Sequence, residues 1–344
     1  MRVFYLACLL LLVCSSSLSA NPQVTQWMRR GRSQWLQGNV EAAIESYQQA
    51  ARLDPRNPQI LNSIGFLLSQ RQRYGEAIAV LQQSARLDPN NIATFLALGF
   101  ALGQNRQLDE AGDAYRHVLS LDNKNIDAFK GLGFVLSQQG DWVGAEQMYR
   151  QVIRLSPRDV KAYLSLGYAL QQQGNFQEAI KVYQTADRVS PLNPDLWVAL
   201  GDVALRQNQI RQAQEKYQRA LELNPRHGGA NLAMAKLWEV QGDLERAISA
   251  YTIASRYSNN REIYRKIANL QLQRNFTAAA IVAYRQLLER FPDDAPTYLE
   301  LGRIFVQQKR RSEARQMLER AAAFYSNDPS TMATVRSLLE QIQE

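Results

Sequence analysis

The sequence predicts an all-α solenoid built from repeated pairs of helices, because three residue types recur with one period. Alanines recur every 34 residues, with a single step of 33, and a column of glycines and a column of prolines follow the same period. The alanines are Ala43, Ala77, Ala111, Ala145, Ala179, Ala213, Ala247, Ala280 and Ala314. A fixed period of this length is typical of proteins whose repeats stack into one continuous core.

The first 20 residues are predicted to be a signal peptide. Arg2 precedes an apolar run, Val3–Cys14, and small residues then lead to a predicted cleavage point after Ala20. A retained anchor is the alternative, although a membrane-spanning helix needs about 20 apolar residues. Both cysteines lie in this run, so the mature chain has no thiol for disulfides, metals or catalysis. We therefore expect an exported protein in the periplasm or another extracytoplasmic compartment.

Each period reads as a helical hairpin. Between Val160 and Asn193, the pattern predicts helices over Ala162–Gln172 and Phe176–Val189, with a break at Gly174 and an end at Pro191. Gly167 and Ala179 are expected to face each other and to let the two backbones approach closely.

Two aromatic columns are expected to fill the core between repeats. The second helices contribute Tyr47, Tyr115, Tyr149, Tyr183, Tyr217, Tyr251 and Tyr284. The first helices contribute Trp27, Phe95, Phe129, Tyr163, Trp197, Tyr264 and Tyr298. Core packing explains this aromatic content without a cofactor.

The order large aromatic, Leu-Gly, Ala, aromatic, Ala, Pro resembles the tetratricopeptide repeat. The resemblance implies a right-handed superhelix with repeats 1–7 over residues 24–260 and repeats 8–9 over residues 261–326. A capping helix is expected over residues 327–344, with an apolar stripe of Met332, Val335, Leu338, Leu339 and Ile342. The seventh repeat lacks the usual aromatic, glycine and proline, so we expect the superhelix to change pitch around Tyr257–Arg261.

The sequence offers no catalytic set, and we predict no enzyme and no cofactor. The two histidines, His117 and His227, lie in different repeats and are expected on the surface. Asp293 and Asp294 adjoin in a turn that could hold a cation weakly, but solvated turn residues are the better explanation. No metal site is predicted.

The resemblance implies that the first helices line a concave groove. Residues directly after the glycine column then point into it, and four consecutive repeats carry aromatics there. The predicted peptide-binding residues are Phe66, Phe100, Phe134, Tyr168, Asp202, Lys236, Asn269 and Arg303. Leu96, Leu164 and Val198, which lie four residues before Phe100, Tyr168 and Asp202 in the same helices, belong to the same predicted site. The alternative is that these rings lean on adjacent helices and only tighten the concave face.

Basic residues are concentrated in the last two repeats. Arg265, Lys266 and Asn269 form a fragment of the clamp that some members of the family use for acidic chain ends. Lys309, Arg310 and Arg311 could attract an anionic membrane surface, although a solvated charged face is the simpler interpretation. The net charge of +8 alone would allow nucleic acid, but the signal peptide argues against that partner.

These features predict a non-enzymatic scaffold that holds a client protein segment in its groove. The signal peptide and the glutamine-rich turn at Gln171–Gly174 are similar to those of cyanobacterial tetratricopeptide proteins. That family includes exported assembly factors or chaperones of photosystem II, so the resemblance implies an assembly role for a membrane protein complex. The alternatives are a self-associating structural or adaptor protein, or a weak carrier of divalent metal.

Overall fold

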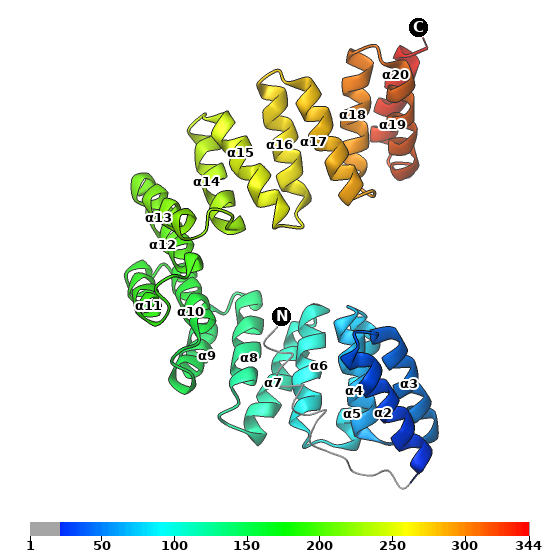
Figure 1. The fold of residues 1–344 in the computed structure, drawn as a ribbon, viewed down its shortest axis with the longest axis vertical. Coiled ribbons are helices and arrows are strands. Elements are labelled where there is room, and N and C mark those ends of the chain that lie inside the picture. Colours follow the sequence, from blue (N-terminus) through cyan, green and yellow to red (C-terminus); the bar gives the residue numbers. More distant parts are fainter. Residues whose placement is uncertain (1–20, 344) are drawn as a thin grey trace. The chain divides into compact units, whose positions relative to one another are not determined.

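The computed structural model describes residues 21–343, and these residues form 19 α-helices and no strand (Figure 1). They divide into two compact units, an N-terminal unit that ends at Ser190 and a C-terminal unit that begins at Pro191. The predicted signal peptide lies outside the described residues. From residue 21 to residue 343, no helix is both long enough and apolar enough to cross a bilayer.

The N-terminal unit consists of five helical hairpins. Its helices are α2 (Pro22–Leu36), α3 (Val40–Leu53), α4 (Pro58–Gln70), α5 (Tyr74–Leu87), α6 (Ile92–Gln104), α7 (Leu108–Leu121), α8 (Ile126–Gln139), α9 (Trp142–Leu155), α10 (Val160–Gln172) and α11 (Phe176–Val189). Each even-numbered helix packs most extensively on the helix that follows it, as the predicted hairpins require.

The C-terminal unit consists of four hairpins and one final helix. Its helices are α12 (Pro194–Arg206), α13 (Ile210–Leu223), α14 (Gly228–Val240), α15 (Leu244–Arg256), α16 (Arg261–Gln273), α17 (Thr277–Arg290), α18 (Ala295–Gln307), α19 (Arg311–Phe324) and α20 (Pro329–Gln341). Helices α15 and α16 pack on each other within this unit. The change of pitch expected at Tyr257–Arg261 stays a prediction.

A side-chain cap starts the first helix of every hairpin. The capping residues are Asn21, Asn57, Asn91, Asn125, Asp159, Asn193, His227, Asn260 and Asp294. Each accepts a hydrogen bond from a backbone N–H two or three residues later, which satisfies a donor that the helix leaves unpaired. From Asn57 onward the caps keep the period of the alanine column.

The turn inside every hairpin contains one residue with positive φ. Four of these residues are glycines, and the other five are Gln72, Arg106, Asn208, Asn275 and Lys309, with φ from 57° to 64°. A residue other than glycine is strained in this conformation because its Cβ approaches the backbone carbonyl. The fold therefore imposes the same turn on Gln72, Arg106 and Lys309, whose residue types do not favour it.

Five of the seven glycines in the column leave room for a tyrosine ring of the second helix, whereas Gly65 and Gly302 leave room for Leu81 and Leu318. A Cβ added at Gly167 would overlap the ring of Tyr183, whereas the expected approach of Gly167 to Ala179 stays a prediction. Tyr183 lies one helical turn after Ala179 and on the same face, and its ring covers the glycine. Ala179 and the other members of the alanine column are fully buried beside these rings.

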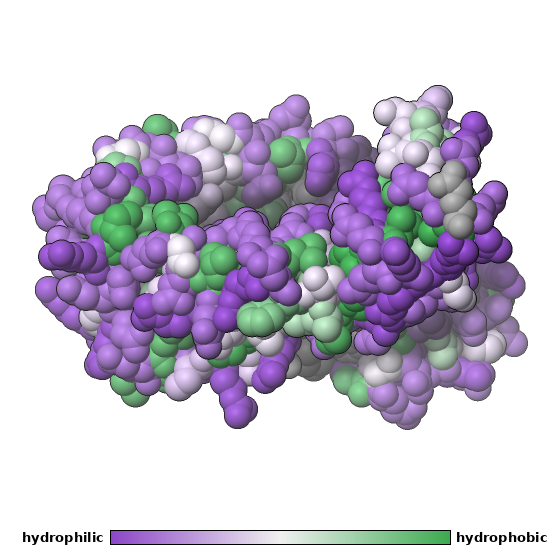
Figure 2. All heavy atoms as spheres, turned by 90° about the horizontal axis from the view of Figure 1, so that it is seen from above, coloured by the Kyte–Doolittle hydropathy of each residue, from purple (hydrophilic) through white to green (hydrophobic). Residues whose placement is uncertain are grey.

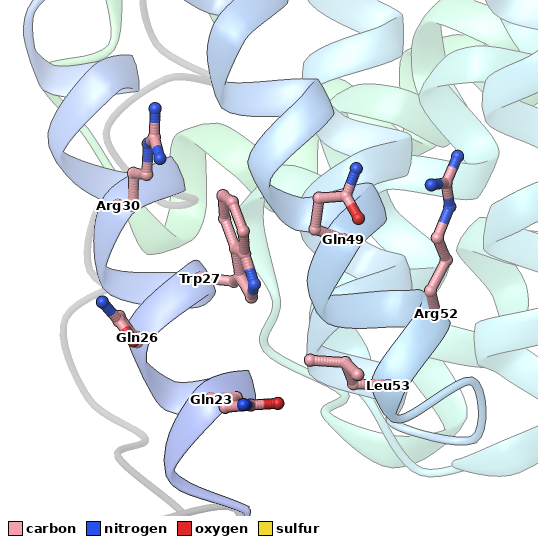
Figure 3. Close-up of a pocket in the computed structure, with 7 residues that line it drawn as sticks. All are labelled: Gln23, Gln26, Trp27, Arg30, Gln49, Arg52 and Leu53. Atoms are coloured by element: carbon pink, nitrogen blue, oxygen red, sulfur yellow. The ribbon is translucent and has the colours of Figure 1, made fainter.

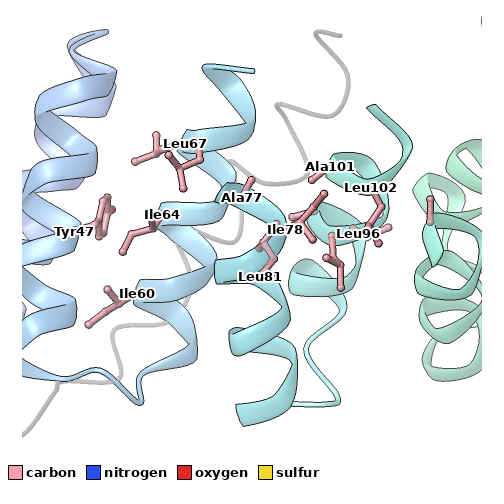
Figure 4. Close-up of a cluster of buried hydrophobic side chains, with 14 of the residues drawn as sticks. Tyr47, Ile60, Ile64, Leu67, Ala77, Ile78, Leu81, Leu96, Ala101 and Leu102 are labelled. Atoms are coloured by element: carbon pink, nitrogen blue, oxygen red, sulfur yellow. The ribbon is translucent and has the colours of Figure 1, made fainter. Parts of the chain in front are cut away.

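The tyrosine rings also reach the next repeat, as predicted. Tyr115 lies against Gly99 of its own hairpin and against Gly131 of the following one. Figure 4 shows Tyr47 of α3 pointing toward Ile60 and Ile64 of α4, within a buried cluster that continues through α5 and α6. The core is therefore a continuous band between neighbouring hairpins of the N-terminal unit.

Helix α20 covers the last hairpin. Its fully buried Val335 packs with Leu318 and Ala321 of α19, and Leu338 and Leu339 join the same cluster. Asp328 caps the helix by accepting hydrogen bonds from the backbone N–H groups of the first turn. These contacts are those expected of a helix that closes the end of a repeat array.

Candidate functional site

Four aromatic residues follow the glycine column on consecutive first helices of the N-terminal unit. Phe66 lies on α4, Phe100 on α6, Phe134 on α8 and Tyr168 on α10. We call these four residues the aromatic ladder. Phe134 is 43% exposed and Tyr168 is 50% exposed, whereas Phe66 and Phe100 are partly buried. An aromatic side chain that keeps this much contact with water is available to a partner.

Three rings of the ladder also rest edge-on against a second aromatic ring. Trp35 pairs with Phe66 at a centroid distance of 6.0 Å, Tyr74 with Phe100 at 6.4 Å, and Trp142 with Tyr168 at 5.8 Å. Each such pair contributes about 0.5–1.5 kcal/mol beyond the burial of its area. The two interpretations of the ladder are thus compatible, since the rings lean on neighbouring helices and still expose a face.

The supporting rings were not predicted from the sequence. Tyr74 and Trp142 occupy the same position at the start of their second helices, two periods apart. This shared position could have indicated from the sequence that both rings have the same role. Trp35 supports the ladder from a different place, near the end of α2.

The residues that lie one helical turn before the ladder residues are not all apolar. Leu96 is buried and Leu164 is partly buried, but the equivalent residue of α8 is Lys130. The ammonium of Lys130 lies 2.6 Å from Asp159, the residue that caps α10. This ion pair neutralises the charge that the column would otherwise present beside Phe134.

Two predicted groove residues of the C-terminal unit hold tyrosine hydroxyls. Tyr217 donates to Asp202 at 2.7 Å, and Tyr284 donates to Asn269 at 2.6 Å. Burial raises the pKa of the Asp202 carboxyl, and the hydrogen bond from Tyr217 opposes that rise. Lys236 is exposed, and Val198 on α12 is partly buried. The role of these residues in binding a peptide stays a prediction.

The predicted clamp fragment is bonded within the chain. Arg265 lies 2.6 Å from Asp294 and also pairs with Glu262, while Lys266 lies 2.6 Å from Glu239. Arg303 pairs with Glu300 at 3.0 Å. An acidic chain end would have to compete with these carboxylates.

The acidic turn differs from the expected solvated pair. Asp294 is only 1% exposed, because it caps α18 and accepts a hydrogen bond from Arg265. Asp293 is exposed and lies 2.8 Å from Arg261. Among residues 21–343, no group of three or more His, Cys, Asp or Glu side chains is arranged to hold a metal ion.

Both histidines have structural contacts. Nε2 of His117 lies 2.8 Å from the carbonyl oxygen of Pro89, and its ring lies 4.1 Å from that of Phe95. Nδ1 of His227 accepts from the N–H of Ala230, while Nε2 lies 3.0 Å from Asp195. His227 therefore replaces the usual asparagine as a helix cap.

A hollow of about 430 Å³ lies on the first hairpin, between α2 and α3 (Figure 3). Its lining residues are Gln23, Gln26, Trp27, Arg30, Gln49, Arg52 and Leu53. The guanidinium of Arg30 lies 5.2 Å from the ring centre of Trp27. Most of the lining is polar and exposed, so the hollow lacks the apolar enclosure of a typical small-molecule site.

The basic turn before α19 is only partly free. Arg310 binds Glu313 and covers the ring of Phe305 at 4.5 Å, whereas Lys309 and Arg311 are exposed. Figure 2 shows one face of the molecule, on which hydrophobic residues form separate patches among hydrophilic ones. Phe134 and Tyr168 are two of several exposed apolar side chains in the described residues, and they lie on consecutive first helices.

Comparisons with known proteins agree with this architecture. A family model described as the cilia and flagella-associated protein 70 C-terminal domain matches residues 11–237, and a tetratricopeptide repeat model matches residues 271–339. No curated protein matches the chain.

Two of the solved structures with the same fold come from bacteria. A tetratricopeptide repeat protein from Parabacteroides merdae is 16% identical, with a TM-score of 0.64 over 73% of this chain and 100% of its own. The C-terminal part of a repeat protein from Cytophaga hutchinsonii is 17% identical, with a TM-score of 0.52 over 70% and 99%. At these identities the likeness shows the fold alone.

Proposed function

Because the chain belongs to the tetratricopeptide repeat proteins, in the family described as the cilia and flagella-associated protein 70 C-terminal domain, we propose that it binds a client protein segment on the aromatic ladder. Proteins built from this repeat are generally interaction scaffolds and not enzymes. The observation that carries the proposal is the exposure of Phe134 and Tyr168, at 43% and 50%, on consecutive first helices. Exposed apolar side chains gathered on one face are typical of interaction sites.

The biological role that we propose is an exported assembly factor or chaperone for a membrane protein complex, with photosystem II as one example. The apolar run at residues 3–14 supports export to the periplasm or another extracytoplasmic compartment. Lys309 and Arg311 support contact with an anionic membrane surface, since each basic residue near such a surface contributes about 1 kcal/mol. The ladder would then hold a segment of the client while the complex forms.

The test uses the double variant Phe100→Ala/Phe134→Ala in a crosslinked pull-down from the native compartment. We expect the wild-type chain to retain an identified client and the double variant to lose it, with unchanged helical circular dichroism. Phe276→Ala is the matched control, because Phe276 is 51% exposed, belongs to the C-terminal unit and is not one of the ladder residues. Unchanged client retention, or a parallel loss of helicity, would show that the rings are packing residues and not a binding site.

A further inference from the structure

The spacing of the ladder suggests the conformation of its ligand. Helix α4 contacts α6 directly, and α6 contacts α8, so Phe66, Phe100 and Phe134 lie on successive packed helices. Axes of packed helices are about 8–10 Å apart. A polyproline II helix advances about 9.3 Å per turn of three residues. One side chain in every three of such a ligand can therefore meet one ring of each repeat.

Other regular conformations match this spacing less well. An extended strand returns to the same face after two residues, or about 6.6 Å. An α-helix has a pitch of about 5.4 Å and needs seven residues, about 10.5 Å, to return near the same line. The distance between the ladder helices therefore does not match an extended strand, but by itself it does not exclude an α-helix.

A row of amides beside the ladder distinguishes the two helical ligands. Gln70, Gln104 and Gln138 each follow a ladder residue by four positions, so they lie one turn further along the same helix face. Gln104 and Gln138 are exposed, and Gln70 uses its carbonyl oxygen to accept from Trp35. An α-helical ligand satisfies its own backbone, whereas a polyproline II ligand has no internal hydrogen bonds and offers its carbonyl oxygens.

The charges near the ladder favour a ligand without charge. Lys130, the charged residue of the preceding column, is already bound to Asp159 at 2.6 Å. An acidic peptide that paired with Lys130 would have to compete with the Asp159 carboxylate for its ammonium. Aromatic grooves with a few hydrogen-bond donors are the usual receptors for proline-rich segments.

We propose that Phe66, Phe100 and Phe134 bind an uncharged, proline-rich segment of a client in the polyproline II conformation. A proline at every third residue packs on each ring, and the ligand's carbonyl oxygens accept hydrogen bonds from the side-chain amides of Gln70, Gln104 and Gln138. This inference rests on the proposed function, and it specifies the class of ligand for the same site.

The test measures fluorescence anisotropy with the full chain and three labelled 12-residue peptides. One is uncharged and proline-rich, one is an amphipathic helix, and one ends in acidic residues. We expect saturable binding of the proline-rich peptide that weakens at least tenfold in Phe100→Ala/Phe134→Ala and several-fold in Gln104→Leu/Gln138→Leu. Phe276→Ala is expected to bind like the wild type.

The outcomes separate this inference from the proposed function. If the helical or acidic peptide binds in place of the proline-rich one, and the ladder variant loses it, the ligand class is wrong and the scaffold function stands. If no peptide binds and the pull-down finds no client that depends on the ladder, both proposals fail. Binding of the proline-rich peptide that the ladder variant leaves unchanged would also overturn the inference.

Discussion

Arg265 and Asp294 form an ion pair of 2.6 Å between the first helices of two successive repeats, and the carboxylate is only 1% exposed. Asp294 also caps α18, so the pair connects the start of one repeat to the first helix of the preceding one. Lys130 and Asp159 occupy the equivalent positions in the N-terminal unit, 2.6 Å apart. Some other repeats carry an apolar residue and an asparagine at these positions, as in Leu96 and Asn125.

Removal of the cation alone should destabilise the C-terminal unit. Arg265→Leu leaves Asp294 buried beside Arg261, which is 3.8 Å away and a weaker partner. We expect a loss of about 3 kcal/mol, because a buried charge without its partner is costly. Urea unfolding followed by circular dichroism measures the change.

The double variant Arg265→Leu/Asp294→Asn is the matched control. It copies the Leu96 and Asn125 combination and should recover most of the lost stability, since asparagine caps the helix without a charge. A single variant as stable as the wild type would contradict the assignment of Arg265 as the partner of Asp294.

Ionisation of the Tyr284 hydroxyl should lower the stability of the C-terminal unit at alkaline pH. Burial raises the pKa of Tyr284 to about 12, and the hydroxyl donates to Asn269 at 2.6 Å. Because the folded state favours the neutral phenol, this stabilisation is complete below the unfolded pKa of about 10 and is lost as pH rises through about 12.

The variant Tyr284→Phe should therefore show a flatter decline of stability above pH 10. At neutral pH it should lose about 1 kcal/mol with the hydrogen bond. Urea unfolding at a series of pH values compares the two proteins, with the exposed Tyr168 changed to Phe as the control. Parallel curves for the wild type and Tyr284→Phe would mean that this hydroxyl is not protected by the fold.

The regular features of the fold were predictable because each recurs. The second helix predicted over residues 176–189 is α11 itself, and the predicted alanine column is fully buried. Nine similar segments repeat the same packing constraint, so an irregular position in one repeat does not obscure the pattern. A single copy, such as residues 160–193 alone, carries much less information.

Features that differ between repeats were harder to predict. Asp294 looked like a solvated turn residue because its partner, Arg265, lies 29 residues earlier and on another helix. The geometry that joins them follows only from the stacking of one repeat on the next. Likewise, the edge-on support of Tyr168 by Trp142 depends on side-chain directions that spacing does not contain.

Asn62 is a polar exception in the column of Leu96 and Leu164. Its Oδ1 atom is buried without a hydrogen-bond partner. An unsatisfied buried acceptor costs about 1–3 kcal/mol, so Asn62→Leu should stabilise the N-terminal unit by about 1 kcal/mol. Thermal unfolding checks this, with Leu96→Asn as the reverse change that should destabilise the same unit. A less stable Asn62→Leu variant would indicate that this oxygen has a partner.

Arg106 tests whether the hairpin turns store strain. Its φ is 64°, whereas the equivalent residue of the next hairpin is Gly140, with φ of 80°. The left-handed conformation destabilises a residue with a Cβ by about 1–2 kcal/mol. Glycine avoids this strain, although its greater conformational freedom in the unfolded chain offsets part of the gain in stability. We therefore expect Arg106→Gly to stabilise the N-terminal unit by about 1 kcal/mol.

The control for this prediction separates the backbone from the side chain. Arg106→Ala removes the same charge and the same long side chain but keeps the Cβ, so it should leave the strain in place and the stability nearly unchanged. Gly140→Ala introduces the strain in the next hairpin and should destabilise that turn by a similar amount. Urea unfolding of the three variants tests the order Arg106→Gly, Arg106→Ala, Gly140→Ala from most to least stable. Equal stability of Arg106→Gly and Arg106→Ala would show that packing of the hairpin, and not backbone conformation, determines the residue at this turn.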